Sequence, residues 1–393
     1  MAQPKLATQR VAHERAGQYL LQASDYSAFI PAALPPKPPV TMDNELWRLL
    51  SDADRALGRL DAVTQILPDT GRFVLMYIRK EALYSSQIEG TQASLDEIVA
   101  FEDSISDADN PADVEEVVNY IRAITFGLQR LETLPVSLRL IRELHAQLMQ
   151  GARGQHKNPG AFRTSQNWIG PQGSTPSNAA FVPPPPHELL QHLGALETFI
   201  HSADSLPALI QIGLVHAQFE TIHPFLDGNG RLGRLLITFL LCEKNILKEP
   251  ALYLSHFFKR YRSEYYQRLQ DTREKGDWEG WLKFFLRGVC NVAEEAAQTA
   301  ARIMAQREEH RRMILAAMSN SQAASAIKLI EHLQRQPVVT VAKAAEIIAK
   351  TYVSANTMIS KLIGLGLLEE LTGQERYRRY RYAPYLNLLR AED

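Results

Sequence analysis

The sequence HPFLDGNGRLGR, residues 223–234, determines how the rest of this chain is interpreted. Its glycines, together with the Asp and Asn beside them, form turns and do not comfortably continue a helix. The leucine-rich residues 231–242 that follow predict that a helix begins here. A glycine-rich turn before a helix N-terminus presents free N–H groups and the positive end of the helix dipole. The sequence therefore predicts an anion-binding site at the start of this helix.

Four side chains of the stretch fit phosphate chemistry. Arg231 and Arg234 lie three residues apart, on one face of the first helical turn, where two guanidinium groups can hold phosphate oxygens. Asp227 offers the carboxylate that Mg²⁺ shares with substrate phosphates. His223 is the side chain that titrates near neutrality in solution, as a general base needs. A turn that only separated two helices would need none of these four groups.

Residues 223–234 meet every defined position of the signature His-x-Phe-x-(Asp/Glu)-Gly-Asn-Gly-Arg-x-x-Arg. The chain thus resembles the Fic family, whose members transfer AMP from ATP to protein hydroxyls. The resemblance implies that ATP is the substrate, that Asp227 binds Mg²⁺ and that His223 is the catalytic base. The ATP-binding residues that it implies in this stretch are Gly228, Asn229, Gly230, Arg231, Leu232, Gly233 and Arg234.

The resemblance also implies individual roles within this set. Asn229 and the backbone N–H groups would stabilise charge on the transferred α-phosphoryl group. Arg231 would orient the loop and the phosphates, and Arg234 would take the γ-phosphate. Gly230 favours AMP transfer over phosphorylation, because a phosphorylating branch of the family has lysine there. Transfer of phosphocholine or of another nucleotide remains open within the same geometry.

The sequence SSQIEG, residues 85–90, ends a predicted helix over residues 71–87. Its form, (Ser/Thr)-x-x-x-Glu-(Gly/Asn), resembles the inhibitory helix motif that some Fic proteins carry near the N-terminus. The resemblance implies that Glu89 pairs with Arg234 and fills the place of the γ-phosphate, so that the unaltered enzyme is weakly active. The alternative is a solvent-exposed glutamate at a helix end.

A short β-hairpin is predicted within residues 161–184, just before the signature. In Fic proteins a hairpin flap at this position aligns the target segment by strand addition, which needs little sequence in the target. The resemblance gives the target-docking residues Trp168, Ile169, Gly170, Phe181 and Val182. As an alternative, the hairpin is a structural cover.

Two tyrosines and two histidines lie outside the signature in predicted helices. By resemblance, Tyr265 and Tyr266 lie near the base and ribose of the nucleotide, although aromatic pairs at this spacing also occur in cores. His216 lies in apolar helical surroundings and is predicted to pack in the core, whereas His145 is predicted to be a packing or surface group and not a ligand.

The composition is that of an ordinary soluble globular protein. A length of 393 residues predicts two or three domains, and a net charge of −1 gives no overall attraction to nucleic acid or to an anionic membrane. Cys242 and Cys290 lack metal-site spacing, and the low cysteine content fits a reducing compartment. No apolar leader or membrane-length run is evident, so we expect a cytoplasmic location and no membrane partner.

The predicted fold class is mainly α: a Fic-type helical bundle with a short β-hairpin flap and a small C-terminal domain like a winged helix-turn-helix. We expect an extended Pro-rich segment over residues 1–45 and a helical region carrying the inhibitory helix over 46–125. The catalytic core is expected over 126–303, a helical linker over 304–322 and the winged-helix-like domain over 323–393.

The C-terminal domain leaves a second class of function open. Its third helix, residues 354–365, would enter a DNA major groove but carries one lysine and no arginine, and the basic residues gather in the wing over 373–382. This favours a structural or protein-binding role over DNA binding. The functional alternatives are a nucleotide-sensing transcriptional regulator and a de-adenylylating hydrolase in which Glu89 positions water. The partners are ATP, a target protein with a Ser, Thr or Tyr hydroxyl (including the chain itself) and, as an open expectation, a second copy of the chain.

Overall fold

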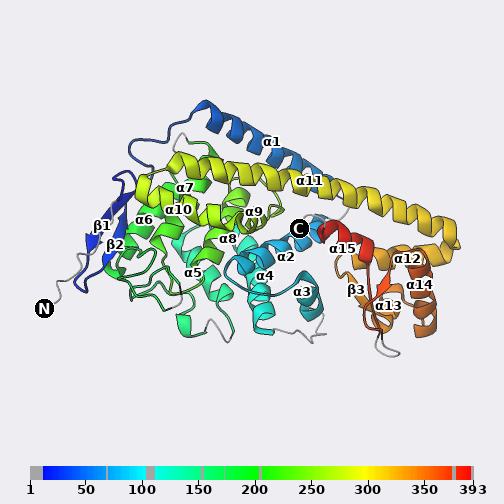
Figure 1. Cartoon of the computed structure of the whole chain (residues 1–393). Coiled ribbons are helices and arrows are strands. Elements are labelled where there is room, and N and C mark those ends of the chain that lie inside the picture. The colour runs from blue at the N-terminus through cyan, green and yellow to red at the C-terminus, as the bar shows by residue number, and fades with distance from the viewer. Residues whose placement is uncertain are drawn as a thin grey trace.

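The computed structural model describes residues 12–67, 70–102, 111–151, 155–171, 173–202, 206–373 and 378–390, and the chain is mostly helical (Figure 1). The helices are α1 Asn44–Ile66, α2 Thr70–Ile88, α3 Leu95–Glu102, α4 Pro111–Leu131, α5 Leu138–Leu148, α6 Leu189–Ile200, α7 Ala208–Ile222, α8 Asn229–Glu243, α9 Ser255–Arg260, α10 Arg262–Lys275, α11 Trp278–Ala317, α12 Asn320–Leu333, α13 Val341–Ile348, α14 Tyr352–Gly364 and α15 Ala383–Arg390. The strands are β1 Gly17–Leu21, β2 Ser27–Pro31, β3 Val338–Thr340, β4 Glu369–Glu370 and β5 Arg379–Arg381.

Helices α7 and α8 form the centre of the core, and the signature loop joins them. Every residue of α7 from Leu209 to Ile222 is buried, because the helix is apolar on nearly all sides. It packs against α6, α8, α10 and α11, and α8 in turn packs against α2, α4 and α5. The loop over residues 223–228 is therefore fixed at both ends by helices that cannot shift without disturbing the core.

Helix α11 is 40 residues long and runs from the core to the C-terminal unit, alongside α1 (Figure 1). At 1.5 Å per residue it spans about 60 Å. It begins at an N-cap, where the Asp277 side chain accepts the Gly280 N–H at 2.9 Å. We expected the core to end at residue 303, but α11 continues to Ala317 because neither glycine nor proline follows Gly288 within it. Most of the predicted linker is therefore part of the same helix as the core.

The N-terminal segment differs from the extended structure that we predicted. Strands β1 and β2 pair antiparallel, with Gly17 opposite Pro31. Phe29 of β2 is fully buried, its ring centroid lies 5.7 Å from that of Phe181, and its N–H donates to the Val182 carbonyl at 2.8 Å. The hairpin thus gains its stability from long-range packing on the segment before the signature. Local sequence does not report such packing.

The predicted flap is shorter than a regular hairpin. One antiparallel bridge joins Ile169 and Phe181, with hydrogen bonds of 2.8 Å and 3.0 Å in the two directions. Proline at position 171 and at positions 183–186 removes N–H donors on both sides, so the ladder cannot extend. Residue 172, at the tip, lies outside the described residues.

The C-terminal unit has the element order predicted from its sequence: helix, strand, helix, helix, strand, strand. Its sheet has the strand order β3-β5-β4, with both pairs antiparallel. A further helix, α15, was not predicted. It packs against α11, and the His310 side chain of α11 lies 2.6 Å from the Tyr382 hydroxyl. Residues 374–377, at the tip of the predicted wing, lie outside the described residues.

Within the described parts of the chain, every helix is too short or too polar to cross a membrane.

Candidate active site

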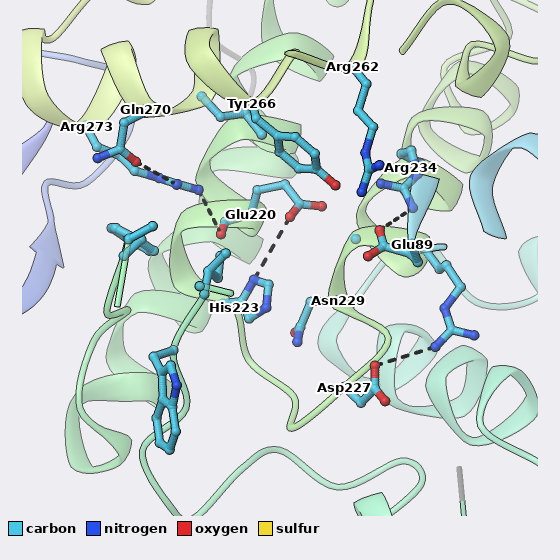
Figure 2. A pocket seen from close by; sticks show the side chains of 18 of the residues that line it. Glu89, Glu220, His223, Asp227, Asn229, Arg234, Arg262, Tyr266, Gln270 and Arg273 are labelled. Atoms are coloured by element: carbon cyan, nitrogen blue, oxygen red, sulfur yellow. Dashed lines mark hydrogen bonds and ion pairs between the residues drawn. The ribbon is translucent and has the colours of Figure 1, made fainter. Parts of the chain in front are cut away.

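A cavity of about 730 Å³ opens where α8 begins, and Figure 2 shows the side chains around it. Its wall combines the last turn of α7, the signature loop with the start of α8, the turn after α2, the flap and α10. The residues outside α10 that line it are Glu89, Trp168, Ile169, Gly170, Ala180, Phe181, Glu220, His223, Leu226, Asp227, Gly228, Asn229, Gly230, Arg231 and Arg234. From α10 it receives Arg262, Ser263, Tyr266, Gln267, Leu269, Gln270 and Arg273.

His223 ends α7 in a left-handed conformation, with φ 50° and ψ 62°. This conformation is uncommon for a residue with a Cβ, so neighbouring groups must hold it. The Arg163 Nε–H donates to the His223 carbonyl at 2.9 Å, and the Asn167 side-chain amide donates to the same oxygen at 3.3 Å. Arg163 and Asn167, in the first part of the segment 161–184, therefore hold the backbone conformation that directs the imidazole.

The imidazole of His223 is neutral at physiological pH. Burial lowers the pKa of His223 to about 3. The positive charges of Arg273 and Arg163 also lower this pKa, and their effect exceeds the opposite effect of the Glu89 carboxylate. A neutral imidazole has a free lone pair and can accept a proton. The side chain keeps 18% of its surface exposed to the cavity, so an incoming hydroxyl can reach it.

The glycine turn has a shape that only these residues permit. Gly228 has φ +76°, and a Cβ there would lie 2.8 Å from the Met149 sulfur. The Asn229 side chain binds the backbone of Phe225 in both directions, accepting its N–H and donating to its carbonyl, each at 2.8 Å. Asn229 therefore positions the loop with its side-chain oxygen and one of its two amide N–H groups, so one N–H is left for the predicted α-phosphoryl contact. The backbone N–H groups of the first turn of α8 remain the anion-binding donors.

Arg234 is buried and is held by the end of α2. Its Nε donates to the Ser85 hydroxyl and its Nη2 to the Ser85 carbonyl, both at 2.9 Å, and Nη2 also donates to Glu89 Oε1 at 2.7 Å. A Cβ at Gly230 would lie 2.4 Å from Glu89 Oε1, so this glycine makes room for the carboxylate. Although burial raises the pKa of Glu89, the pairing with Arg234 outweighs it and leaves that pKa below the ordinary value. Glu89 is therefore ionised at neutral pH.

Arg231 faces a different carboxylate. It forms an ion pair with Glu116 of α4, and its Nη2 lies 3.6 Å from Asp227 Oδ1. Its guanidinium thus fastens the signature loop to α4, which agrees with an orienting role and leaves fewer donors for phosphate. Asp227 accepts the Gly228 N–H at 2.6 Å, yet half of its side chain (49%) is exposed at the cavity.

The residues at the cavity fit Mg²⁺ as a shared ion and not as one enclosed by the protein. Mg²⁺ prefers oxygen ligands and is commonly held by one or two carboxylates with substrate phosphates. Asp227 offers one exposed carboxylate beside the anion-binding turn. Among the described residues, no group of three or more His, Cys, Asp or Glu is placed to hold a metal by itself.

Two histidines outside the signature have structural roles. His145 is buried and stacks on Phe225 at 3.7 Å; its Nδ1 accepts the Gly160 N–H at 2.9 Å, and its Nε2 lies 3.1 Å from the Asp227 carbonyl. His145 therefore holds the signature loop in place through Phe225 and Asp227. His216 is a core residue, as predicted, with its ring nitrogens 2.9 Å from the Gly233 carbonyl and from the Tyr265 hydroxyl.

Some of the residues predicted to bind the nucleotide or the target line the cavity, and others are buried behind its wall. Tyr265 is fully buried against His216 and does not line the cavity, whereas Tyr266 does. Leu232, Gly233 and Val182 are likewise buried behind the wall. Sequence reasoning missed Arg262 and Arg273, because α10 is polar on nearly all sides and its sequence does not indicate which polar residues face a cavity. Arg273 lies 3.9 Å above the Phe181 ring.

The structure places a neutral histidine beside a glycine turn and a helix N-terminus, the kind of site that can bind a phosphate group, in a mainly α fold. The model of the Fic/DOC family N-terminal region matches residues 47–129, and the Fic/DOC family model matches residues 135–241. The chain is therefore similar to the Fic/DOC family over residues 47–129 and 135–241.

Relatives of this chain carry adenylyltransferase names. A probable protein adenylyltransferase of Aquifex aeolicus is 28% identical over 202 residues, which are 50% of this chain and 55% of that protein. The protein adenylyltransferase Fic of Drosophila grimshawi is 29% identical over 170 residues, 42% of this chain and 30% of that protein. This chain thus spans about half the length of the first relative and less than a third of the second.

The fold has a solved counterpart. The crystal structure of a Fic family protein from Desulfovibrio desulfuricans G20 matches with a TM-score of 0.57 at 19% identity, covering 88% of this chain and 97% of that one. The match supports the mainly α fold across most of the chain.

Proposed function

We propose that this protein transfers AMP from ATP to a hydroxyl side chain of a protein, itself included, and that Glu89 inhibits the transfer. The observation that carries the proposal is the placement of neutral His223 and of the Arg234–Glu89 pair in one cavity, on either side of the α8 N-terminus. The adenylyltransferase names of the relatives support the same activity.

The proposed reaction uses the groups at the cavity in the following way. The phosphates of ATP bind the N–H groups of the first turn of α8. His223 takes the proton of the target hydroxyl as its oxygen attacks the α-phosphorus, and pyrophosphate leaves with the electron pair of the broken P–O bond. Asp227 would hold Mg²⁺, which would neutralise negative charge on the phosphates when bound. Arg262, whose guanidinium lies 5.7 Å from the Tyr266 ring, adds positive charge to the opposite wall.

Inhibition follows from competition for Arg234. The guanidinium has a limited set of donors, and Ser85 and Glu89 occupy Nε and Nη2. A γ-phosphate that needs the same donors meets a carboxylate of the same sign at the same place. ATP can then bind productively only when Glu89 moves away. The turn after α2 allows this movement because the Glu89 side chain is 37% exposed.

The flap supplies the docking element in this proposal. The bridge between Ile169 and Phe181 lies at the cavity, and the partly exposed Trp168 lies beside it. A target segment would pair with the edge of the flap and place its hydroxyl near His223. Phe29 and Arg273 support the flap from behind, which keeps the edge in place.

The test is intact-protein mass spectrometry after incubation with ATP and Mg²⁺. We expect an AMP adduct on Glu89→Gly, little on the wild type, and none on Glu89→Gly/His223→Ala. An AMP adduct that persists in the double variant would show that His223 is not the catalytic base. If Glu89→Gly gains no adduct and modifies no protein in a cell extract, the transferase proposal fails. Loss of AMP from a premodified protein would instead support the hydrolase.

Two expectations about partners and one about location remain predictions. DNA binding by residues 323–393 is tested by a shift assay over a range of salt concentrations, because phosphate contacts weaken steeply with salt. Pairing of two copies is tested by light scattering. The cytoplasmic location is tested by fractionation of the native source.

A further inference from the structure

Glu220 and His223 face each other with buried polar atoms beside the cavity. Glu220 lies in the last turn of α7, and its Oε2 is 4.0 Å from His223 Nδ1. Among the described residues, neither His223 Nδ1 nor Glu220 Oε1 has a hydrogen-bond partner. Figure 2 shows the carboxylate next to the imidazole at the wall of the cavity. Such unpartnered buried atoms are rare, because their desolvation is not compensated.

Gly233 of the signature leaves the space that Glu220 fills. A Cβ at position 233 would lie 2.4 Å from Glu220 Oε1. Arg273 fixes the same end of α7, because it donates to the Glu220 carbonyl and to the Thr221 hydroxyl, each at 3.2 Å. The backbone around Glu220 and the missing side chain at position 233 thus direct the carboxylate toward His223.

We propose that Glu220 is a positioning residue that accepts the Nδ1–H of His223 and so leaves Nε2 to take the proton of the attacking hydroxyl. This inference rests on the proposed transferase function. The hydroxyl oxygen bonds to the α-phosphorus, its proton moves to Nε2, and pyrophosphate leaves with the electron pair of the broken bond. The resulting imidazolium carries a positive charge beside the carboxylate, which stabilises it and keeps the ring in place.

Glu220 must be ionised for this role, so the transfer depends on pH. Burial raises the pKa of Glu220 to about 7; Arg234 and Arg273 oppose the rise, and Glu89 adds to it. The carboxylate form is present above that pKa, so transfer increases as the pH rises through about 7. Replacing Glu89 removes a negative neighbour and moves the increase to lower pH. The charged and titratable groups that face Glu220 are His223 on α7, Arg234 on α8, Tyr265 and Arg273 on α10, and Glu89 after α2.

The first test is steady-state kinetics in the Glu89→Gly protein. We expect Glu220→Gln to lower kcat about 100-fold, within the range for general-base catalysis, with the KM for ATP changed less than about threefold. The increase in kcat/KM near pH 7 should also be lost. Glu243→Gln is the matched control, because Glu243 accepts the Val136 N–H at 2.7 Å at the far end of α8 and should keep the parent kinetics. A Glu220→Gln protein with parent kcat and an unchanged pH profile overturns the proposal.

Two further measurements separate this role from a folding defect. Gly233→Ala keeps the carboxylate and takes its space, so we expect a loss of kcat about tenfold with a folded protein. ¹⁵N NMR of the histidine side chains reads the tautomer without turnover, with His223 assigned by its absence in His223→Ala. The Nδ1–H tautomer in the parent and its loss in Glu220→Gln support the proposal, and an Nε2–H tautomer in the parent overturns it. If the Nδ1–H tautomer is found in a parent that transfers no AMP, the proposed function fails and the pairing stands.

Discussion

Two glutamates from different elements reach the start of α8, and each pairs with one arginine of the signature. Glu89 follows α2 and binds Arg234 at 2.7 Å, whereas Glu116 lies within α4 and forms an ion pair with Arg231. The chemistry of the two pairs is the same, but their surroundings differ. The Glu89 side chain is 37% exposed and lines the cavity, and the Glu116 side chain is 17% exposed and is fixed on a helix.

This difference indicates which of the two ion pairs can separate. Glu89 lies in a turn after α2 that is closed by hydrogen bonds from the N–H groups of Glu89 and Thr91 to the Ser86 carbonyl. A turn at a helix end opens at a small cost in free energy, because few contacts are lost. Moving Glu116 would require α4 to shift against α2, α5 and α8. We therefore expect the Glu89 pair to regulate the site and the Glu116 pair to hold it together.

The largest effect is expected from Glu89→Gly. A hydrogen bond between charged groups contributes roughly 1.5–3 kcal/mol. Its removal should therefore raise self-modification with AMP about 10- to 100-fold, at roughly 1.4 kcal/mol per factor of ten. The rate is measured by intact mass against time at fixed ATP. Glu89→Gln keeps a weaker hydrogen bond, so its rate of self-modification should lie between those of wild type and Glu89→Gly. Equal rates for wild type and Glu89→Gly would show that the pair does not limit the reaction.

Glu116→Gln should have the opposite effect. Arg231 is 7% exposed, and a buried charge that loses its partner destabilises a protein by about 3 kcal/mol. We expect a lower free energy of unfolding in urea and, in the Glu89→Gly protein, about tenfold slower AMP transfer, because the loop loses its attachment to α4. Activation by Glu116→Gln would mean that both glutamates inhibit, and the contrast between them would disappear.

Ser85→Ala should give a smaller change. The Ser85 hydroxyl accepts the Arg234 Nε–H at 2.9 Å whether or not Glu89 is paired, while the Ser85 carbonyl still holds Nη2. The expected cost is about 1 kcal/mol of unfolding free energy, with AMP transfer by wild type altered less than about fivefold. If Ser85→Ala activates as strongly as Glu89→Gly, the hydroxyl and not the carboxylate controls Arg234.

The smallest effect concerns pH. The folded-state pKa of Glu89 is lowered, so the stability of its pair with Arg234 is present above the ordinary glutamate range and is lost only as the pH falls through that lowered value. The ratio of ATP Kd values for wild type and Glu89→Gly should therefore stay constant between about pH 6 and pH 8. Isothermal titration calorimetry measures the ATP Kd of each protein. A ratio that approaches one at the acidic end would show that Glu89 is protonated there.

The sequence by itself determined the groups whose roles depend on local order. The His223–Arg234 stretch specified a turn, a helix start and the spacing of two arginines. The α2 helix, with Glu89 just past its end, followed from the same local rules. The element order of the C-terminal unit was also readable, because its apolar periodicity and turn residues are local signals.

Only the tertiary structure decided which side chains are free to act. Asn229 binds Phe225, Arg231 binds Glu116, and Tyr265 binds His216, so three residues assigned to ATP from the sequence are partly or wholly committed to neighbours. The placement of Glu220, with Gly233 making room for it, also depends on two helices meeting. Contacts between residues far apart in the chain are set by packing, and the identity and spacing of residues along one segment do not contain that information.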